Sequence, residues 1–393
     1  MTISTDVRSK RYDFTLRTKP SSVRAVSYSY PIFVRDEPDW AEFAARLAEL
    51  GADHFTLVAD SGLPYELISL VHQQVSALGL PCLLLTLDTG ERAKTMETAL
   101  ALAYQARTNG GGTHASCFIA LGGGLVGNIT GLAASLLVRG TRLVHIPTTL
   151  LAGTDSVLSC KQGVNGQTSP DLLVKNLVGT FFPPELVLVY PSFWQGLAAD
   201  EIRSGLCELI KNIVSIHPHR YQEVLALLNQ EARYSAQEYL RIFEWCFQAK
   251  QEVMVDDAHE QGAALVLENG HTVGHALEAL AGLPHGQAIG LGLLVSAHLS
   301  HARGYLSLED VGKHYQLLQR NGAPTTLSAE IPIEGLLRLV GCDNKIGYLP
   351  PRQGHHAMVL LRKLGQPVTH NGLPLTYVSD AELRAAIADI QET

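Results

Sequence analysis

The sequence predicts a chain of two domains, an α/β domain over residues 1–190 followed by a mainly α-helical domain over residues 191–393. Three observations lead to this prediction. The chain has 393 residues, whereas single hydrophobic cores stop growing at roughly 250–300 residues. Short β-rich runs alternate with helical stretches from residue 30 to residue 160. Long helical patterns with few β-branched runs between them follow residue 192.

The first half contains candidate strands and helices that alternate along the chain. Short apolar runs are typical of buried strands, and the longer amphipathic stretches between them are typical of helices. Such an alternation implies a parallel sheet that helices cover on both faces. The expected strands are residues 55–59, 81–86, 117–121 and 143–146, and the expected helices are 39–50, 65–78, 94–108 and 129–138.

The second half reads as a set of long helices. Three prolines and several aromatic residues cluster over residues 182–194, where the change between the two patterns occurs. We expect the boundary between the domains there. The helices expected beyond it are residues 201–216, 236–254, 271–281 and 287–302.

Composition and charge limit the classes of protein to which this chain could belong. The formal charge of -8 argues against nucleic acid as a partner, because binding to its backbone needs a basic stripe. No apolar run approaches the roughly 20 residues of a membrane-spanning helix, so no membrane partner is expected. The six cysteines are scattered and form no C-x-x-C pair, which suits a reducing compartment. We therefore expect a cytoplasmic protein.

A glycine-rich turn predicts a nucleotide site in the first half. The segment GGGLVGN, residues 122–128, follows one expected strand and precedes a helical run. Glycines at such a turn let a diphosphate approach backbone N–H groups at the positive end of the helix dipole. Asp60 follows another strand, where an acidic residue can accept from ribose hydroxyls. Four other residues could contribute to the same site: Glu91, Lys94, Thr148 and Thr149.

Three histidines within fifteen residues predict a metal site in the second half. His271 and His275 are four residues apart in a helical run, so both project from one face, and His285 follows. A catalytic divalent metal ion takes about three protein ligands and keeps one position open. The spacing leaves open which two histidines bind the metal and which carboxylate completes the set.

A lysine-rich polar set predicts a phosphorylated polyol as the substrate. Glu208 and Lys211 lie three residues apart with apolar neighbours on both sides, which suits a buried functional face better than a surface ion pair. Several lysines and a metal ion in one site would neutralise a phosphate. The other lysines in short polar islands are Lys161, Lys175, Lys250 and Lys345.

Several motifs follow one another in order between about residue 60 and residue 345. They are GGGLVGN, RGTRLVHIPTTLLAGTDS, KNLVGTFFPP, RSGLCELIKN, ENGHTVGHALE, PHGQA and DNK. With these motifs the chain resembles the dehydroquinate synthase superfamily, the sugar-phosphate cyclases. The resemblance implies a Rossmann-like N-terminal domain, a helical C-terminal domain, a homodimer, NAD and one divalent metal ion, zinc or cobalt.

The resemblance also implies roles for individual residues. Glu208, His271 and His285 would bind the metal ion, and His275 would face the substrate phosphate and the path of proton transfer. Arg139 would reach the phosphate site of the partner subunit, and Lys345 would close the site. The residues that would hold hydroxyls and phosphate are Asp155, Lys161, Asn176, Lys211 and Lys250. Those that would hold NAD are Asp60, Glu91, Lys94, Gly122, Gly123, Gly124, Asn128, Thr148 and Thr149.

The substrate within the superfamily is indicated by two positions. Dehydroquinate synthases carry Asn and Arg where this chain has Glu268 and Ala264, and without the Arg a carboxylated substrate loses its cation. Glu268, as well as the segments 156–162 and 343–348, resembles the branch that converts glucose 6-phosphate into a carbocycle for aminocyclitol antibiotics. Glu268 is then the candidate for proton removal. Ile346 departs from the Arg that usually follows DNK.

Three other functions stay open on the sequence. A heptulose 7-phosphate cyclase with a valiolone-type product and a 3-dehydroquinate synthase belong to the same superfamily. An NAD- and metal-dependent polyol dehydrogenase shares the two-domain plan. The lysine set argues against the dehydrogenase, because a simple polyol carries no phosphate. Net consumption of NAD would favour the dehydrogenase, since a cyclase leaves NAD unchanged.

Overall fold

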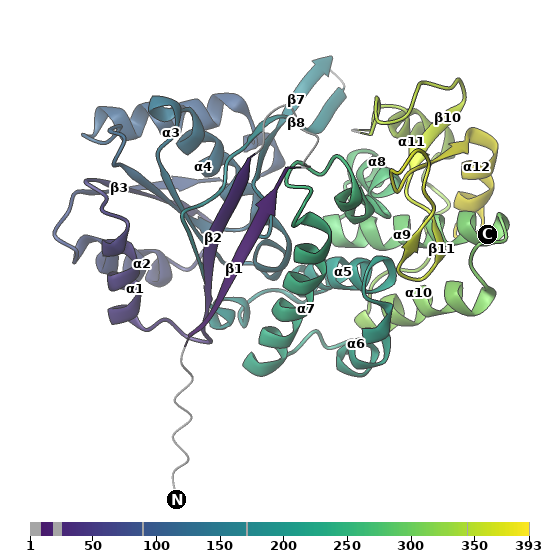
Figure 1. The fold of residues 1–393 in the computed structure, drawn as a ribbon, viewed down its shortest axis with the longest axis horizontal. Helices are drawn as coiled ribbons and strands as arrows, with labels where there is room; N and C mark the ends of the chain where they lie inside the picture. Colours follow the sequence, from purple (N-terminus) through teal and green to yellow (C-terminus); the bar gives the residue numbers. More distant parts are fainter. Residues whose placement is uncertain (1–8, 19–25, 89, 170–171, 344, 393) are drawn as a thin grey trace, which may run out of the picture. The chain divides into compact units, whose positions relative to one another are not determined.

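The computed structural model describes residues 9–18, 26–88, 90–169, 172–343 and 345–392, with the side chains of 167–169 and 172–173 left out. The chain divides into two compact units, coloured along the sequence in Figure 1. The first unit comprises Met1–Thr15 and Tyr28–Leu197, and the second comprises Leu16–Ser27 and Ala198–Thr393. The chain passes into the second unit a few residues beyond the predicted boundary at residue 190.

The first unit is built on a seven-stranded sheet with the strand order β1-β2-β9-β6-β5-β3-β4. From β2 to β4 every neighbouring pair of strands is parallel. The bounds are β1 Lys10–Arg17, β2 Ser27–Val34, β3 Phe55–Asp60, β4 Cys82–Leu87, β5 Cys117–Gly122, β6 Arg142–Pro147 and β9 Leu186–Val189. The four predicted strands are confirmed as β3 to β6, each ending one residue later than predicted.

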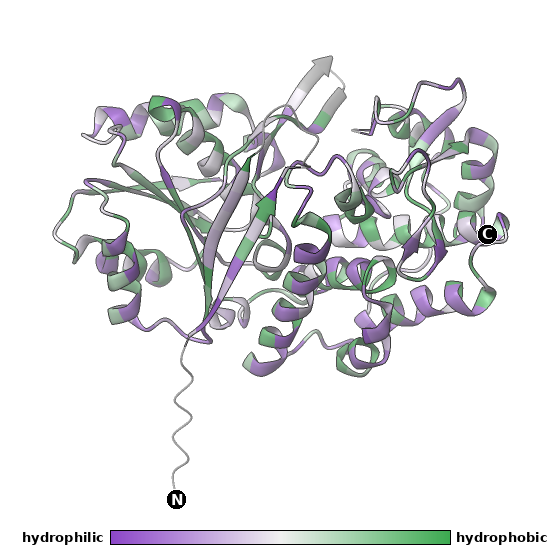
Figure 2. Ribbon diagram, viewed as in Figure 1, coloured by the Kyte–Doolittle hydropathy of each residue, from purple (hydrophilic) through white to green (hydrophobic). Residues whose placement is uncertain are grey.

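Helices cover both faces of this sheet, as Figure 1 shows. Successive strand residues point to opposite faces, so Leu57 packs with α1 Trp40–Glu49 and α2 Tyr65–Ser76 in one core. Its neighbour Val58 packs with α3 Met96–Thr108 and α4 Gly124–Leu136 in the other core. The central strands are accordingly hydrophobic along their length in Figure 2. The predicted α/β architecture is confirmed.

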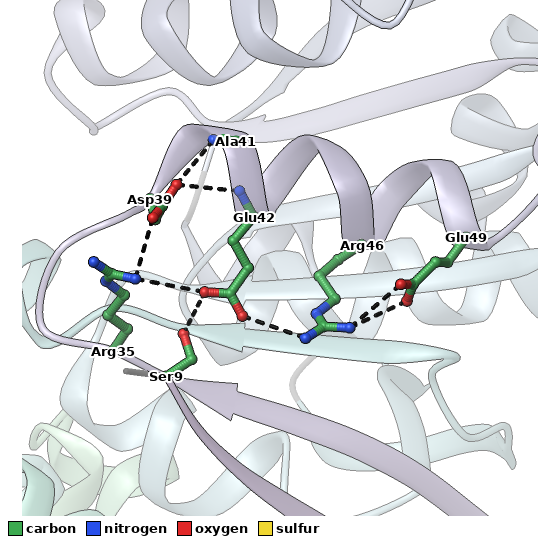
Figure 3. A network of polar contacts seen from close by, with 7 residues as sticks. All are labelled: Ser9, Arg35, Asp39, Ala41, Glu42, Arg46 and Glu49. Carbon is green, nitrogen blue, oxygen red and sulfur yellow. Dashed lines mark hydrogen bonds and ion pairs between the residues drawn. The ribbon is translucent and has the colours of Figure 1, made fainter. Parts of the chain in front are cut away.

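Helix α1 begins at an N-cap that the sequence encodes. Asp39 accepts hydrogen bonds from the backbone N–H groups of Ala41 and Glu42, which would otherwise lack partners in the first helical turn. Figure 3 shows how charged side chains continue from this cap along the helix. Glu42 accepts from Ser9 and pairs with both Arg35 and Arg46. These pairs are half-buried near the surface, where such pairs each contribute about 0–1 kcal/mol, so the cap and the apolar face determine the helix.

The first unit also contains an antiparallel hairpin that the sequence did not predict. Strand β7 Lys161–Ser169 pairs with β8 Leu172–Phe181, with two register shifts along its length. Two short helical turns lie before it, η2 Leu137–Arg139 and the π-helical turn η3 Ala152–Ser156. Gly179 is required in β8, because a Cβ there would lie 2.4 Å from the backbone oxygen of Gln162.

The second unit is mainly helical, as predicted. It also holds a short part of the N-terminal segment, since the N–H of Arg17 donates to the Val255 carbonyl at 2.9 Å. Its helices are α5 Ala199–Ser215, α6 Tyr221–Leu227, α7 Ala236–Met254, α8 His271–Ala281, α9 His285–Ala302, α10 Leu308–Asn321, α11 Ile333–Val340 and α12 Asp380–Ala388. Two small sheets, not predicted, pair β10 His355–Met358 with β13 Thr376–Ser379 and β11 Leu361–Lys363 with β12 Gln366–Pro367.

Helix α9 lies against α5 and α8 at distances that only glycine permits. A Cβ at Gly286 would lie 2.3 Å from the Cα of Ser204 in α5, and a Cβ at Gly292 would lie 2.0 Å from the Gly270 oxygen at the start of α8. The N–H of Gly286 also donates to the Ser204 hydroxyl at 2.9 Å. These contacts fix the three helices that carry Glu208 and the histidines of interest.

None of the helices in the described part of the chain is both long enough and apolar enough to cross a membrane.

We expect Gly292→Ala to destabilise the second unit, because its methyl group would collide with backbone and force α8 and α9 apart. Overpacking of this kind costs about 1–3 kcal/mol. The matched control is Gly312→Ala in α10, where a Cβ would meet nothing within 4 Å and helix propensity favours Ala by about 1 kcal/mol. Thermal and denaturant unfolding of both variants would test this. Equal or greater stability of Gly292→Ala would contradict the close packing described here.

Candidate nucleotide and metal sites

The glycine turn of the first unit lies where strand β5 enters helix α4. Gly122 ends β5, Gly123 is the N-cap residue of α4 without a side-chain hydrogen bond, and Gly124 begins the helix. Side chains would not fit here, since a Cβ at Gly122 would lie 2.7 Å from Val126 and one at Gly124 would lie 2.8 Å from the Ser156 hydroxyl. A pocket beside the turn is lined by Gly122, Gly123, Gly124, Gly127, Asn128, His145, Pro147, Ala152, Ser156, Val157, Lys161 and Gln162.

Two other predicted residues of the nucleotide site lie at the same edge of the sheet. Asp60 ends β3 one residue beyond the pair Ala59–Leu121, so it stands beside Gly122 on the neighbouring strand. Thr148 follows β6, and its N–H donates to the Gly122 oxygen at 3.0 Å. Within the described residues the Thr148 hydroxyl is buried and has no hydrogen-bond partner. A buried polar atom of this kind favours a ligand with a polar group at this edge.

The remaining predicted nucleotide residues are engaged with the protein itself. Thr149 accepts from the N–H of Ala152, where the next helical turn begins. Asn128 donates to the Gly124 oxygen at 2.8 Å and accepts from the N–H of Gly163 at 3.0 Å, so its amide ties α4 to the β7 strand.

Glu91, Lys94 and Asn176 meet around the hairpin. Lys94 is buried, and its Nζ donates to the Asn176 Oδ1 at 2.6 Å. Glu91 accepts from Asn165 at 2.9 Å and pairs with Lys175 at 3.6 Å. Asn176 adopts a left-handed backbone conformation with φ of 53°. The structure therefore brings a predicted cofactor residue and a predicted substrate residue into direct contact.

Three predicted substrate residues of the first unit lie on irregular backbone. Lys161 begins β7 and lines the glycine pocket. Asp155 lies in the π-helical turn η3. Arg139 is exposed at the end of η2, with a left-handed φ of 68°.

The second unit brings Glu208, His271 and His285 together from three different helices. One donor atom from each lies within 4.8 Å of the others. The Nε2 atom of His285 is 3.3 Å from Oε1 of Glu208, and the Nε2 atom of His271 is 3.6 Å from the same oxygen. Within the described residues that oxygen is buried and accepts no hydrogen bond. Two imidazole nitrogens and a carboxylate oxygen that converge in this way fit a divalent metal ion such as zinc or cobalt.

Hydrogen bonds at Nδ1 turn both histidines toward this point. The Nδ1 of His271 lies 3.3 Å from the Asn269 carbonyl oxygen, which can only accept. The Nδ1 of His285 lies 3.0 Å from a carboxylate oxygen of Glu278, which likewise accepts. Each Nδ1 therefore carries a proton, and each Nε2 is the atom available to a metal ion.

The electrostatics of these three residues favour a cation. Burial raises the pKa of Glu208, but the charge of Lys211 outweighs it and holds the pKa well below its ordinary value. Burial, then Lys211, lowers the pKa of His271 to about 3, so this imidazole is neutral. Burial also lowers the pKa of His285, but the carboxylates of Glu208 and Glu278 raise it to about 10. A metal ion at Nε2 would replace the proton that faces Glu208 there, while the Nδ1 proton stays with Glu278.

Lys211 and Lys250 are the predicted lysines of the second unit's helices, and both are buried. Lys211 lies one helical turn after Glu208 in α5, and its Nζ donates to Oε2 of that carboxylate. The prediction of a buried face for this pair is confirmed. A buried charge is expensive unless it is paired, so the lysine and the carboxylate depend on each other. Lys250 lies in α7.

A second polar cluster surrounds Lys345. Its other members are Glu268, Asp343 and His275. The Nζ of Lys345 lies 3.1 Å from Oε2 of Glu268 and 2.8 Å from Oδ1 of Asp343. Burial lowers the pKa of Lys345, but these two carboxylates raise it above its ordinary value. The other oxygen of Asp343 is 3.9 Å from Nδ1 of His275. His275 also packs with its ring centroid 5.1 Å from that of His271.

Glu278 and Asp343 were not predicted as site residues, but the structure places both beside predicted ones. A signal for Glu278 was present, because it lies seven residues after His271 and three after His275 and so shares their helical face. Asp343 begins the DNK motif, but the motif did not indicate which residues it would contact. It comes from the loop after α11, and its contacts with Lys345 and His275 depend on the fold of that loop.

Comparisons with known proteins agree with the two-unit architecture. Residues 84–204 match the family model of the 3-dehydroquinate synthase N-terminal domain, and residues 205–346 match that of its C-terminal domain. A 2-deoxy-scyllo-inosose synthase of Micromonospora echinospora is 42% identical over 350 residues, which cover 88% of this chain and 85% of that protein.

Two solved structures share the fold. A 2-deoxy-scyllo-inosose synthase in complex with carbaglucose-6-phosphate, NAD+ and Co2+ has a TM-score of 0.86 and 28% identity, covering 97% of this chain and 100% of that one. A 2-epi-5-epi-valiolone synthase from Streptomyces hygroscopicus, with NAD+ and Zn2+ bound, has a TM-score of 0.76 and 26% identity, covering 94% of this chain and 98% of that one. From the matching family models and the curated relative, this chain belongs to the dehydroquinate synthase superfamily of sugar-phosphate cyclases.

Proposed function

We propose that this chain converts D-glucose 6-phosphate into 2-deoxy-scyllo-inosose and inorganic phosphate, at the start of aminocyclitol antibiotic assembly. The observation that carries the proposal is the convergence of Glu208, His271 and His285 beside the buried Lys211. A cation and a lysine together suit a phosphorylated polyol. The 42% identity with a 2-deoxy-scyllo-inosose synthase supports this substrate over others of the superfamily.

The first unit would hold NAD. The glycine turn leaves the N-terminal N–H groups of α4 open to a diphosphate, and Asp60 and the Thr148 hydroxyl lie at the same edge of the sheet. When bound, NAD supplies the reversible oxidation of the C4 hydroxyl and is regenerated within one turnover. The other residues proposed for this site are Glu91, Lys94, Asn128 and Thr149.

Glu208, His271 and His285 would hold one divalent metal ion, zinc or cobalt. When bound, the ion supplies Lewis-acid polarisation of the sugar oxygen that becomes a ketone. Lys211 would keep Glu208 ionised and would add positive charge where negative charge develops on the substrate. The donor set suits zinc and cobalt alike, because both accept imidazole and carboxylate ligands.

Glu268 is the proposed base for proton removal at C5. A ketone at C4 acidifies this proton, so that phosphate can leave from C6. Glu268 lies at the end of the short helix η6 Ala263–Glu268, and the buried Lys345 holds its carboxylate at 3.1 Å. His275 would serve the phosphate and the path of proton transfer. Ring opening then exposes the C1 aldehyde, and carbon–carbon bond formation between C1 and C6 closes the carbocycle.

The remaining polar residues would bind the substrate. Lys345 would close the site, and Arg139 would reach the phosphate site of a partner subunit in a homodimer. A cytoplasmic location is likewise proposed, on the scattered cysteines of the sequence. The residues proposed to hold hydroxyls and phosphate are Asp155, Lys161, Asn176 and Lys250.

A heptulose 7-phosphate cyclase is the second candidate. Ile346 is 67% exposed at the position where the superfamily motif usually continues with Arg. With Ile346 in place of Arg, one positive charge beside Lys345 that could contact the substrate is missing. The similarity to a 2-epi-5-epi-valiolone synthase is consistent with this alternative, although its 26% identity is lower than that of the curated relative.

We expect phosphate release from glucose 6-phosphate, without accumulation of NADH, when the protein is supplied with NAD and cobalt or zinc. Sedoheptulose 7-phosphate and the dehydroquinate precursor, assayed in parallel, should release none. Phosphate assays and absorbance at the NADH wavelength measure the two quantities. Release from the heptulose alone would change the product, and net NADH formation without phosphate release would indicate a polyol dehydrogenase.

Glu268→Gln should slow phosphate release by about 100-fold or more, the usual contribution of a positioned base. The amide can still accept from Lys345, so the loss would reflect proton removal rather than a broken contact. Binding of NAD should be intact. Glu252→Gln is the matched control, because that carboxylate is 64% exposed and pairs with His217. An unchanged rate in Glu268→Gln would remove this residue from the mechanism.

Treatment with a chelator should abolish phosphate release, and addition of cobalt or zinc should restore it in the wild-type protein. Glu208→Gln should fail to recover under the same conditions, because it lacks the charged oxygen on which both imidazoles converge. Nucleotide binding should persist throughout, since the residues proposed for it belong to the first unit. Full activity after exhaustive chelation would refute the metal-dependent mechanism.

A further inference from the structure

Glu278 is a nearly buried carboxylate to which neither the sequence analysis nor the proposed mechanism gives a role. It lies in α8, the helix that begins with His271, and its side chain is 3% exposed. Its Oε1 lies 3.0 Å from Nδ1 of His285 at the start of α9. A carboxylate held this far from water needs a partner that justifies its burial.

We infer that Glu278 is a positioning residue that aims His285 at the metal ion, an inference that rests on the metal site proposed above. An ionised carboxylate can only accept a hydrogen bond, so it keeps a proton on Nδ1 of His285. Nε2 is then the ligand atom, and it is the nitrogen that lies 3.3 Å from Oε1 of Glu208. A carboxylate behind a histidine also makes the imidazole a more basic ligand.

The two histidines differ in how their rings are held. His271 is oriented by the backbone carbonyl of Asn269 at 3.3 Å, which no side-chain substitution removes. His285 is oriented by a side chain from a different helix. A substitution of Glu278 can therefore change the orientation of His285 without changing the backbone of α9.

A rival geometry makes Glu278 a direct ligand instead. Donor atoms of His275, Glu278 and His285 also lie within 4.8 Å of one another. Two observations favour the set with Glu208. Oε1 of Glu208 accepts no hydrogen bond from any described residue, whereas Oε1 of Glu278 already accepts from His285. Glu208 also faces the Nε2 atoms of two imidazoles rather than one.

The test is cobalt binding to the metal-free protein, measured by chelator competition and by the visible absorption spectrum of bound Co2+. Glu278→Ala should weaken affinity by about 10–100-fold, the usual effect of removing such a partner. Glu278→Gln should lose less, because its amide oxygen can still accept from Nδ1, and the spectrum should keep the wild-type ligand field. Thermal unfolding and NAD affinity show whether each variant is folded.

Asp380→Ala is the matched control for Glu278→Ala. Asp380 also pairs with an imidazole, since its Oδ1 lies 2.7 Å from Nε2 of His356, but neither residue belongs to the metal set. The change removes the same kind of contact from the same unit, and cobalt affinity should be unchanged.

Three outcomes would overturn the inference. Wild-type affinity in both Glu278→Ala and Glu278→Gln would show that His285 needs no such partner. A Glu278→Gln spectrum with an altered ligand field, together with retained binding by Glu208→Gln, would make Glu278 a ligand. A wild-type protein that binds no cobalt would overturn the metal site itself, and with it the proposed function, which the first two outcomes leave standing.

Discussion

The packing of helix α9 against α5 and α8 is the constraint on which the second unit depends. Gly286 and Gly292 let the backbones approach to distances that any Cβ would block. Because Glu208, His271 and His285 each come from a different one of these helices, this approach places their donor atoms within 4.8 Å. If a methyl group held these helices further apart, the donor atoms of Glu208, His271 and His285 would no longer converge on one point.

Two buried lysines of the second unit are each paired with carboxylates. Lys211 is paired with Glu208, and Lys345 is held between Glu268 and Asp343. Such pairs gain little stability by themselves, since the cost of desolvation offsets most of their attraction. Their value is positional, because a paired side chain has one orientation. The pKa of Glu208 is low and the pKa of His285 is raised, so the carboxylate is ionised and its surroundings favour a cation.

In the first unit, sheet topology rather than helix packing brings the candidate site residues together. Parallel strands place their carboxyl ends at one edge, so Asp60, Gly122 and Thr148 become neighbours although they are far apart in the sequence. The hairpin β7–β8 adds Lys161 and Asn176 to this unit. Two predicted cofactor residues form hydrogen bonds to this hairpin. Lys94 donates to Asn176, and Asn128 accepts from the backbone N–H of Gly163 in β7.

The sequence by itself determined the two-part architecture, the central strands, the glycine turn and the helical face shared by His271 and His275, because these depend on periodicity and local backbone requirements. Periodicity and spacing did not determine β1, β2 and β9, the hairpin, or which carboxylate and which histidines would share a point, because these depend on contacts between residues far apart in the chain. The set Glu208, His271 and His285 was named in advance only through the resemblance to the superfamily. Only the tertiary structure decided that Glu208 lies between the Nε2 atoms of His271 and His285 and that Glu278 stands behind His285. The physical reason is that helix-to-helix distances, set by glycine contacts, bring these side chains together.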